Sequence, residues 1–343
     1  KIFITLFIIF GVLKFFILKH YNLTDSFDLF HLTLALTSFN YFFNLEQEKK
    51  IKILFLFKKF TLFFVFVFFV QYFFRDILPK AFTDVPNLFK EIGVEKYTVE
   101  INLKQLYRPN GLIGNPITFG FVLNLLLAIE LFYVRVVKST IKSRIIIITI
   151  LLMIFFLFSR ANIILALIIT SLSLIKRENV LKISLILSFL IVLIFPINKF
   201  LYSSVTEYRY NIDRITGKDF RAQKSTDEHI KDYIKAYNTF LKKPILGSSA
   251  KEMKDKQIIT DGAVPYLILT HGAGGFLFFL IAYFSILKSF LKQLINDQII
   301  FPLFIITLLI FPYSILNSAI LNKGVFLIIF SFFGVTSNLI LKK

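Results

Sequence analysis

Apolar runs of near bilayer-spanning length recur along this chain of 343 residues. A helix needs about 20 apolar residues to cross a bilayer, and it also satisfies its own backbone hydrogen bonds inside lipid. With 56% hydrophobic residues and a mean hydropathy of +0.73, the chain is predicted to be an all-α polytopic membrane protein. We expect about ten transmembrane helices in a single transmembrane domain over residues 1–343. Their approximate ranges are 2–18, 27–44, 57–74, 116–134, 145–159, 161–175, 181–198, 264–287, 298–316 and 324–341.

Charge and cysteine content exclude several classes of function. The chain contains no cysteine, which excludes disulfides and thiolate metal sites. The sequence has no cluster of metal ligands either, and we expect no cofactor. The formal net charge of +19 suits a nucleic-acid partner at first sight. The positions of the basic residues explain the charge better, so we expect no nucleic-acid binding.

Short, net-basic segments follow every even-numbered apolar run. Cytoplasmic loops of membrane proteins carry an excess of Lys and Arg, so this parity predicts that both termini lie in the cytoplasm. The basic residues concerned are Lys49, Lys50, Lys52, Lys58 and Lys59, then Arg135, Lys138, Lys142 and Arg144, then Lys176, Arg177 and Lys182, then Lys288 and Lys292, and finally Lys342 and Lys343.

An arginine interrupts the apolar sequence FFLFSRANIILA at residues 155–166. Residues 145–175 would be about 46 Å long as one helix, which is too long for one span and short for two. A single helix would also carry one of its two basic flanks outside, whereas a helical hairpin keeps both inside. We therefore expect two short helices with residues 159–162 at the tip, near the outer headgroups. There Arg160 either snorkels to the headgroups or binds an anionic ligand.

Two longer segments, residues 75–115 and 199–263, are predicted to lie outside as the first and the large periplasmic loop. In the second, the apolar residues of 226–241 recur with helical spacing. We expect an amphipathic helix there that lies across the outer face. Pro244 and Gly247 are suited to end that helix.

The sequence YRPNGLIGNP, residues 107–116, leads directly into the fourth apolar run. Pro116 suits the first turn of a helix, and exposed amides at a helix start are suited to bind phosphate. With Arg108 beside them, these amides form a candidate phosphate site. The alternative is an ordinary interfacial loop with a snorkelling arginine.

The large periplasmic loop adds further candidate ligands for phosphate, because Arg presents a planar fork of donors to phosphate oxygens. Any one of them alone is more often a solvated surface charge. Just before the eighth run, Asp261 is suited to act as a general base or to orient a sugar hydroxyl, or else to cap the helix. His271 and the glycines beside it most simply serve packing. The candidate phosphate ligands are Arg209, Arg214, Arg221, His229 and Lys231.

Taken in order, four motifs resemble the signature of the bacterial O-antigen polymerase and ligase superfamily. Arg108-x-x-Gly111 with Gly114-Asn115-Pro116 resembles its R-x-x-G…G-N-P element, and Ser159-Arg160 resembles its S-R element. Residues 244–247 resemble the P-x-x-G that ends its large periplasmic loop. Asp261, followed by Gly272 and Gly275, resembles the element that enters the next helix. The resemblance covers about residues 105–290.

This resemblance implies an enzyme of the bacterial cytoplasmic (inner) membrane. Its substrate would be an undecaprenyl-pyrophosphate-linked glycan, and its activity that of a glycosyltransferase that polymerises repeat units into surface polysaccharide. Arg160 and Asp261 would be catalytic, while Arg108, Arg209, Arg214, Arg221, His229 and Lys231 would bind substrate. The lipid bilayer and a chain-length regulator protein are further implied partners, and no cofactor is implied.

Departures from the family pattern leave alternatives open. Family ligases carry a functional His where this chain has Asp261, which favours the polymerase branch, although a ligase differs from it only in the acceptor. An Arg is common shortly before the P-x-x-G helix, where this chain has His229 or Lys231. A polysaccharide flippase should show repeated halves, and the sequence has no internal repeat. A non-catalytic membrane assembly protein would not need arginines at lipid-phosphate depth.

The topology is testable because the chain has no native cysteine. A cysteine introduced at Ser203, in the large periplasmic loop, should react with an impermeant maleimide added to intact cells. A cysteine at Ser139 should react only after the cells are opened, because net-basic loops stay in the cytoplasm. The opposite labelling pattern would overturn the placement of every candidate residue.

Overall fold

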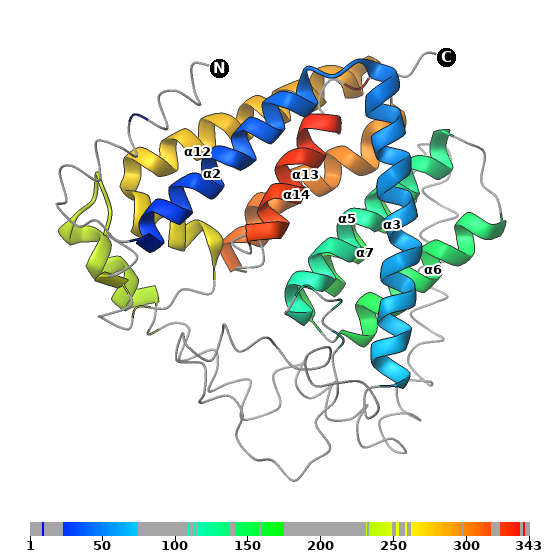
Figure 1. The fold of residues 1–343 in the computed structure, drawn as a ribbon, viewed down its shortest axis with the longest axis horizontal. Coiled ribbons are helices and arrows are strands. Elements are labelled where there is room, and N and C mark those ends of the chain that lie inside the picture. The colour runs from blue at the N-terminus through cyan, green and yellow to red at the C-terminus, as the bar shows by residue number, and fades with distance from the viewer. Residues whose placement is uncertain are drawn as a thin grey trace, which may run out of the picture.

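The computed structural model describes a set of segments that together form a helical bundle (Figure 1). The described residues are 9, 23–74, 109, 111, 113, 115–136, 141–157, 159–174, 231, 233–248, 252–253, 258, 262–296, 298–316, 323–336 and 339. Of the predicted spans, 2–18 apart from Ile9 and all of 181–198 lie outside these residues.

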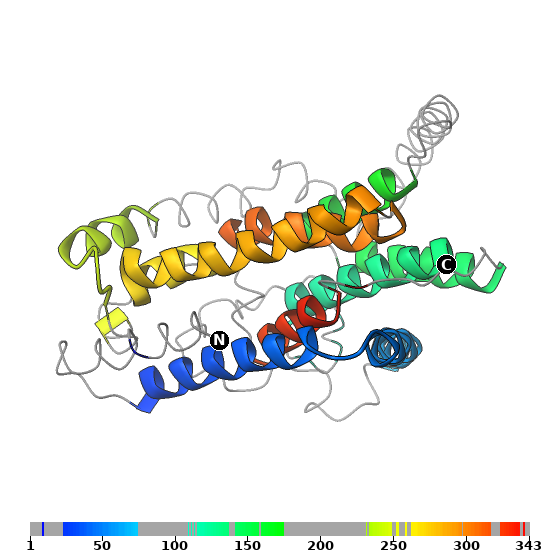
Figure 2. The ribbon, with the colours of Figure 1, turned by 90° about the horizontal axis from the view of Figure 1, so that it is seen from above.

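Every regular element within the described segments is a helix. Figure 2 shows most of the long helices running along one general direction, with α3 seen nearly end on. The elements are α2 (Leu23–Phe43), α3 (Gln47–Phe73), α5 (Pro116–Val136), α6 (Ile141–Phe156), α7 (Arg160–Leu174), α12 (Ala263–Asn296), the 3-10 helix η3 (Gln298–Ile300), α13 (Phe301–Leu316) and α14 (Lys323–Thr336).

Two of these helices, α3 and α5, are each long and apolar enough to cross a membrane, and the bent α12 makes a third if it counts as one span. The chain is therefore all-helical over the described residues and has the helices of a membrane protein. The described residues thus contain fewer candidate spans than the ten predicted, and the prediction of about ten spans is not confirmed. Helices α7, α13 and α14 are apolar but shorter than a full span over their described lengths.

The predicted hairpin around Arg160 is present. Helix α6 ends at Phe156 and α7 begins at Arg160, within a few residues of the limits expected from length and charge. Helix α5 begins at Pro116, as predicted from the proline.

Two predicted boundaries are wrong. Helix α3 begins at Gln47, ten residues before the expected start at 57, and α12 continues to Asn296, past the expected end at 287. Both additions carry lysines among apolar residues, so they form helix that hydropathy does not detect. Hydropathy measures how well a segment suits lipid, whereas a helix continues through polar residues that favour it.

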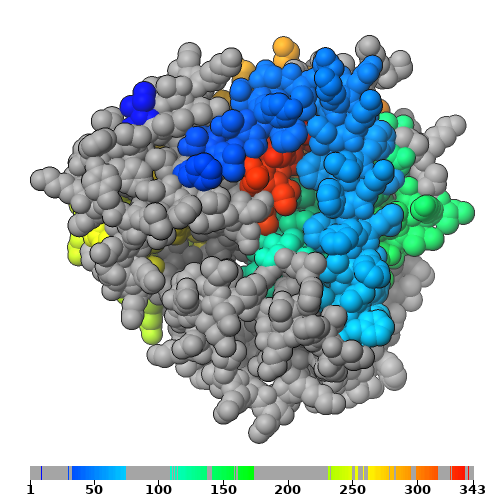
Figure 3. Space-filling model, viewed as in Figure 1, coloured from blue at the N-terminus to red at the C-terminus, as the bar shows by residue number. Residues whose placement is uncertain are grey.

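Helix α5 forms the centre of the bundle, because every side chain from Thr118 to Phe132 is buried. Helix α3 lies at the perimeter, and Figure 3 shows it along the visible surface. Its exposed side chains include Phe63, Phe66 and Phe69. Such an apolar outer surface is costly in water and suits contact with lipid chains.

Contacts at both ends of α5 fix the directions of its neighbours. At its start, Asn162 near the beginning of α7 bonds Ile117 and Tyr313, and Tyr313 lies near the end of α13. At the end of α5, the Arg135 guanidinium donates a hydrogen bond to the Ser173 carbonyl near the end of α7, and it lies 5.7 Å from the Phe301 ring at the start of α13. Helices α5 and α7 are therefore parallel, and α6 returns the chain between them. Helix α13 runs antiparallel to both.

An ion pair with one fully buried partner joins α3 to α5. The Lys58 ammonium lies 3.7 Å from a Glu130 carboxylate oxygen and 3.1 Å from the centre of the Tyr133 ring. Glu130 is fully buried, and neither of its carboxylate oxygens has a hydrogen-bond partner among the described residues. Lys58 keeps 23% of its side chain exposed. Loss of Lys58 would therefore leave a fully buried carboxylate without a counterion, whereas loss of Glu130 would leave an ammonium that still contacts solvent.

This asymmetry predicts the order of stability in a set of variants. Lys58→Met leaves a buried carboxylate without its counterion and should destabilise the protein by about 3 kcal/mol. Glu130→Gln should cost less, because Lys58 retains solvent contact and the Tyr133 ring. The double variant should recover most of the loss. Thermal unfolding in detergent measures the order, and a double variant no more stable than Lys58→Met would contradict it.

Candidate functional site

A buried side-chain amide, Asn162, joins three helices at the tip of the hairpin. Its Nδ2 donates to the Ile117 carbonyl in the first turn of α5, at 2.9 Å, and to the Ser159 hydroxyl, at 3.0 Å. Its Oδ1 accepts from the Tyr313 hydroxyl of α13, also at 3.0 Å. Asn162 is fully buried. These bonds place the starts of α5 and α7 and the C-terminal part of α13 at one end of the bundle.

A second amide, Asn124, extends this polar cluster into α5. Its Nδ2 donates to the Gly120 carbonyl at 2.9 Å and to the Asn162 carbonyl at 3.2 Å. Gly120 allows the helices to approach this closely, because a Cβ added there would lie 2.4 Å from Asn162 Nδ2. The contact between α5 and α7 therefore depends on a residue without a side chain at this position.

The loop before α5 is held against α3. The Gly111 amide donates to the buried side chain of Gln71 at 2.9 Å, and Asn115 caps α5 by accepting from the Ile117 amide at 2.8 Å. The end of α3 thus lies beside the start of α5. The tip at 159–162 consequently lies next to the end of the 107–116 motif, because Asn162 bonds the carbonyl of Ile117, the residue after that motif.

Backbone hydrogen bonds connect the P-x-x-G motif at residues 244–247 to a break in helix α12. Gly272 has a φ of 63° and a ψ of −173°, which interrupts the helix. The Leu269 carbonyl accepts from Ser248, while the Ala273 and Gly274 amides donate to the carbonyls of residues 244 and 245. The motif therefore supplies hydrogen-bond partners for backbone groups that the break leaves without partners inside the helix.

Glycine is required on both sides of this backbone-to-backbone contact. Gly247 and Gly272 both have positive φ, at 71° and 63°. A Cβ on Gly247 would lie 2.5 Å from the Gly272 nitrogen, and one on Gly272 would lie 2.2 Å from the Ile245 carbonyl oxygen. The spacing of these glycines in the sequence therefore reflects one backbone-to-backbone contact. The packing role expected for Gly272 fits this contact, although its partner is the 244–247 motif.

The last part of the segment predicted to form the large periplasmic loop also lies at this end of the bundle. It is helical at 231 and from 233 to 242, and the helix ends before Pro244 as predicted. The Tyr233 hydroxyl donates to the Ile315 carbonyl at 3.1 Å, close to Tyr313 in α13. Helix α12 begins beside Ile315 as well. It bends by 63° between Ala263–Leu277 and Phe279–Leu294.

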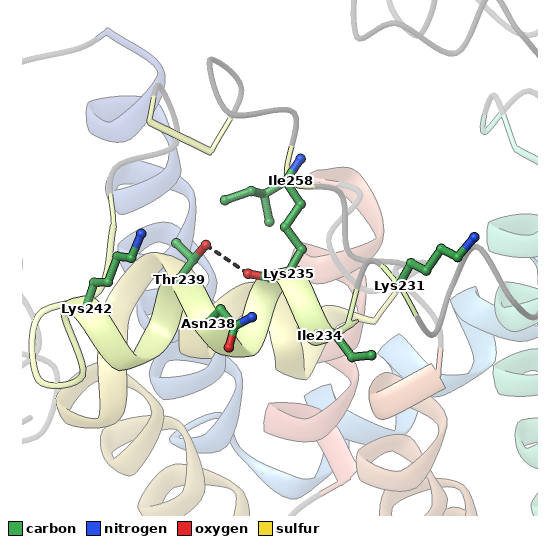
Figure 4. A pocket seen from close by; sticks show the side chains of 7 residues that line it. All are labelled: Lys231, Ile234, Lys235, Asn238, Thr239, Lys242 and Ile258. Atoms are coloured by element: carbon green, nitrogen blue, oxygen red, sulfur yellow. Dashed lines mark hydrogen bonds between the residues drawn. The ribbon is translucent and has the colours of Figure 1, made fainter.

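Lys231 is the predicted binding residue whose side chain the structure describes. It is exposed and lines a pocket of about 520 Å³ (Figure 4). The side chain of Arg160 lies outside the described residues, although its backbone begins α7. The expected proximity of Arg108 and Arg160 therefore stays a prediction. The other candidates, Arg108, Arg209, Arg214, Arg221, His229 and Asp261, also lie outside the described residues.

The sequence analysis missed the polar residues that hold the site together. Asn124, Gln71 and Tyr313 received no role, and Asn162 was noted only as part of the tip. An available signal was the occurrence of amides within apolar helices, since polar side chains inside a membrane protein are costly unless bonded. Within the described ranges, no group of three or more His, Asp, Glu or Cys residues is arranged to hold a metal.

No protein-family model matches the chain, and no curated protein matches it.

Loss of the Asn162 amide should destabilise the bundle more than loss of any one of its partners. Asn162→Ala leaves buried groups of α5, α7 and α13 unbonded and should cost about 2–3 kcal/mol. Tyr313→Phe removes one hydrogen bond and should cost about 0.5–1.5 kcal/mol. Asn44→Ala is the control, because Asn44 is exposed and bonds only within its own turn. Unfolding midpoints in detergent test this order, and equal losses at 44 and 162 would refute it.

Proposed function

We propose that the protein is a glycosyltransferase that polymerises lipid-pyrophosphate-linked oligosaccharides into surface polysaccharide. The donor would be an undecaprenyl-pyrophosphate-linked glycan on the outer face of the bacterial cytoplasmic membrane. Both termini of the chain would then lie in the cytoplasm. The observation that supports the proposal is the pair of hydrogen bonds from Asn162 to the Ile117 carbonyl and to the Ser159 hydroxyl, because it brings the residue after the 107–116 motif next to the Ser159-Arg160 motif.

The joined motifs suit an anionic leaving group. The starts of α5 and α7 lie at the same end, and each presents backbone N–H groups and the positive end of a helix dipole. Arg160 is the first residue of α7, and Arg108 precedes the loop that Gln71 holds. Arginines there would stabilise charge that develops on a departing pyrophosphate.

The proposed reaction exchanges one C–O bond for another. A hydroxyl of one repeat unit attacks the anomeric carbon of the other chain, and the bond from that carbon to the lipid pyrophosphate breaks. The hydroxyl proton passes to Asp261 as the general base, and the lipid pyrophosphate leaves as an anion. Ligation to a different acceptor follows the same steps, so the acceptor alone separates the two activities.

A flippase for the same lipid-linked glycan is the second candidate, because discontinuous helices such as α12 form substrate sites in transporters. In this chain the amides freed at Gly272 donate to carbonyls of the 244–247 motif. They are thereby occupied by the chain's own backbone. This observation favours the polymerase.

The polymerase proposal predicts a specific defect in Arg160→Lys. Lysine keeps the charge and reaches the headgroups equally well, but it lacks the planar fork suited to phosphate. Loss of one charge-assisted hydrogen bond, worth about 1.5–3 kcal/mol, corresponds to roughly ten- to a hundredfold slower chain growth. The measurement is the glycan length distribution in cells that lack the native protein and express the variant at matched abundance.

Arg144→Lys is the matched control, because Arg144 is exposed in the first turn of α6, at the opposite end of the bundle. It should restore normal chain lengths. Normal lengths with Arg160→Lys as well would refute the catalytic role. In cells without the protein, single repeats attached to the final acceptor indicate a polymerase, whereas long unattached polymer indicates a ligase. Lipid-linked repeats retained on the cytoplasmic face would favour the flippase.

A further inference from the structure

The helix at residues 231–242 presents three distinct faces. One face packs against the protein, where Ala236 and Thr239 are buried and Phe240 is partly buried. This face contacts a small apolar cluster that includes Leu269, just before the break in α12. The helix is therefore fixed to the body of the protein and cannot turn its other faces inward.

The second face is an exposed apolar stripe. Ile234, Tyr237 and Leu241 follow one another at spacings of three and four residues, so they align along the helix. They are 57%, 61% and 55% exposed, and Ile245, in the turn just after the helix, is 68% exposed. Large apolar side chains gathered in this way usually mark a surface that another apolar phase covers.

The third face carries lysines. Lys231, Lys235 and Lys242, with Asn238 among them, also follow at spacings of three and four residues and line the pocket described above. In Figure 4, Lys231 and Lys242 lie at the two ends of the helix. At 3.6 residues per turn, the lysine stripe lies about 100° around the helix from the apolar stripe. Among the residues that the structure describes, none that lines the pocket is acidic.

We propose that this helix lies in the headgroup region of the bilayer, with Ile234, Tyr237 and Leu241 at the boundary of the acyl chains and the lysines at lipid phosphates. Adjacent apolar and cationic faces are characteristic of interfacial helices, and Tyr is enriched at that depth. The lysine stripe complements the charge of lipid phosphates. Figures 1 and 2 place the helix beside the beginning of α12, which is a candidate membrane span if its two bent halves count as one.

Contact of this helix with the bilayer would anchor the protein to the lipid surface. This proposal does not depend on the proposed enzymatic activity. The helix leads directly into the 244–247 motif that fills the break in α12. A bilayer-bound helix therefore sets the depth of that motif relative to the headgroups.

The absence of tryptophan from the chain allows a direct test. A single Trp at Tyr237 in the full-length protein reports on the apolar stripe, and one at Ile234 is a second reporter on the same stripe. Asn238→Trp is the matched control on the lysine stripe, and Phe66→Trp in α3 is the reference for lipid contact. Each variant is reconstituted into vesicles of phosphatidylcholine with some phosphatidylglycerol, with bromine placed near the headgroup or near the chain end.

Trp at 234 and 237 should be quenched more strongly by bromine near the headgroup than by bromine near the chain end, and at least about twofold more than Trp at 238. Emission from both stripe positions should be blue-shifted and protected from aqueous iodide. Full access to iodide without quenching by bromolipid would overturn the proposal and indicate that the stripe faces water. Replacing the three lysines by Gln should weaken the bromolipid quenching, and an unchanged signal would overturn the phosphate contacts.

Discussion

The arrangement of the bundle depends on the buried side-chain amide of Asn162. Lipid chains are as apolar as the side chains of the helices, so the hydrophobic effect does little to select one helix register over another in a membrane. Hydrogen bonds between helices are directional and do select it. At one end of α5, Asn162 donates one to Ile117 and accepts one from Tyr313, while Arg135 donates one to Ser173 at the other end. The directions of α5, α7 and α13 follow from these contacts.

The same constraint explains the irregular backbone around Gly272. A broken helix leaves carbonyls and amides unbonded, which lipid cannot satisfy. The residues of the 244–247 motif supply the missing partners, and this requires two backbones to approach at Gly247 and Gly272 with no side chain between them. The two glycine-containing segments therefore act as one structural unit, although these glycines are 25 positions apart in the sequence.

Local features of the sequence predicted part of this structure. Pro116, Pro244 and the lengths of the apolar runs near Arg160 determine backbone conformation within a few residues, so the corresponding helix ends were predictable. The hydrogen bond between Asn162 and Tyr313 joins residues 151 positions apart, and no local pattern encodes it. The early start of α3 was missed because hydropathy does not detect helix that carries lysines among its apolar residues. Of the candidate site, Lys231 is described together with its side chain, whereas the chemistry assigned to Arg160 and Asp261 stays a prediction.

If the helix at 231–242 lies at the headgroups, several otherwise separate features share one depth. Tyr233 ties that helix to Ile315, and Tyr313 in the same turn of α13 ties Asn162 and the hairpin tip to the same end. The first turn of α5 is held there through Ile117. The phosphates of any lipid-linked substrate occupy this depth too, because its lipid tail fixes its position in the bilayer. Anchoring the helix at the lipid surface would thus bring the two helix starts to the level of a pyrophosphate without requiring the protein to bind the lipid tail.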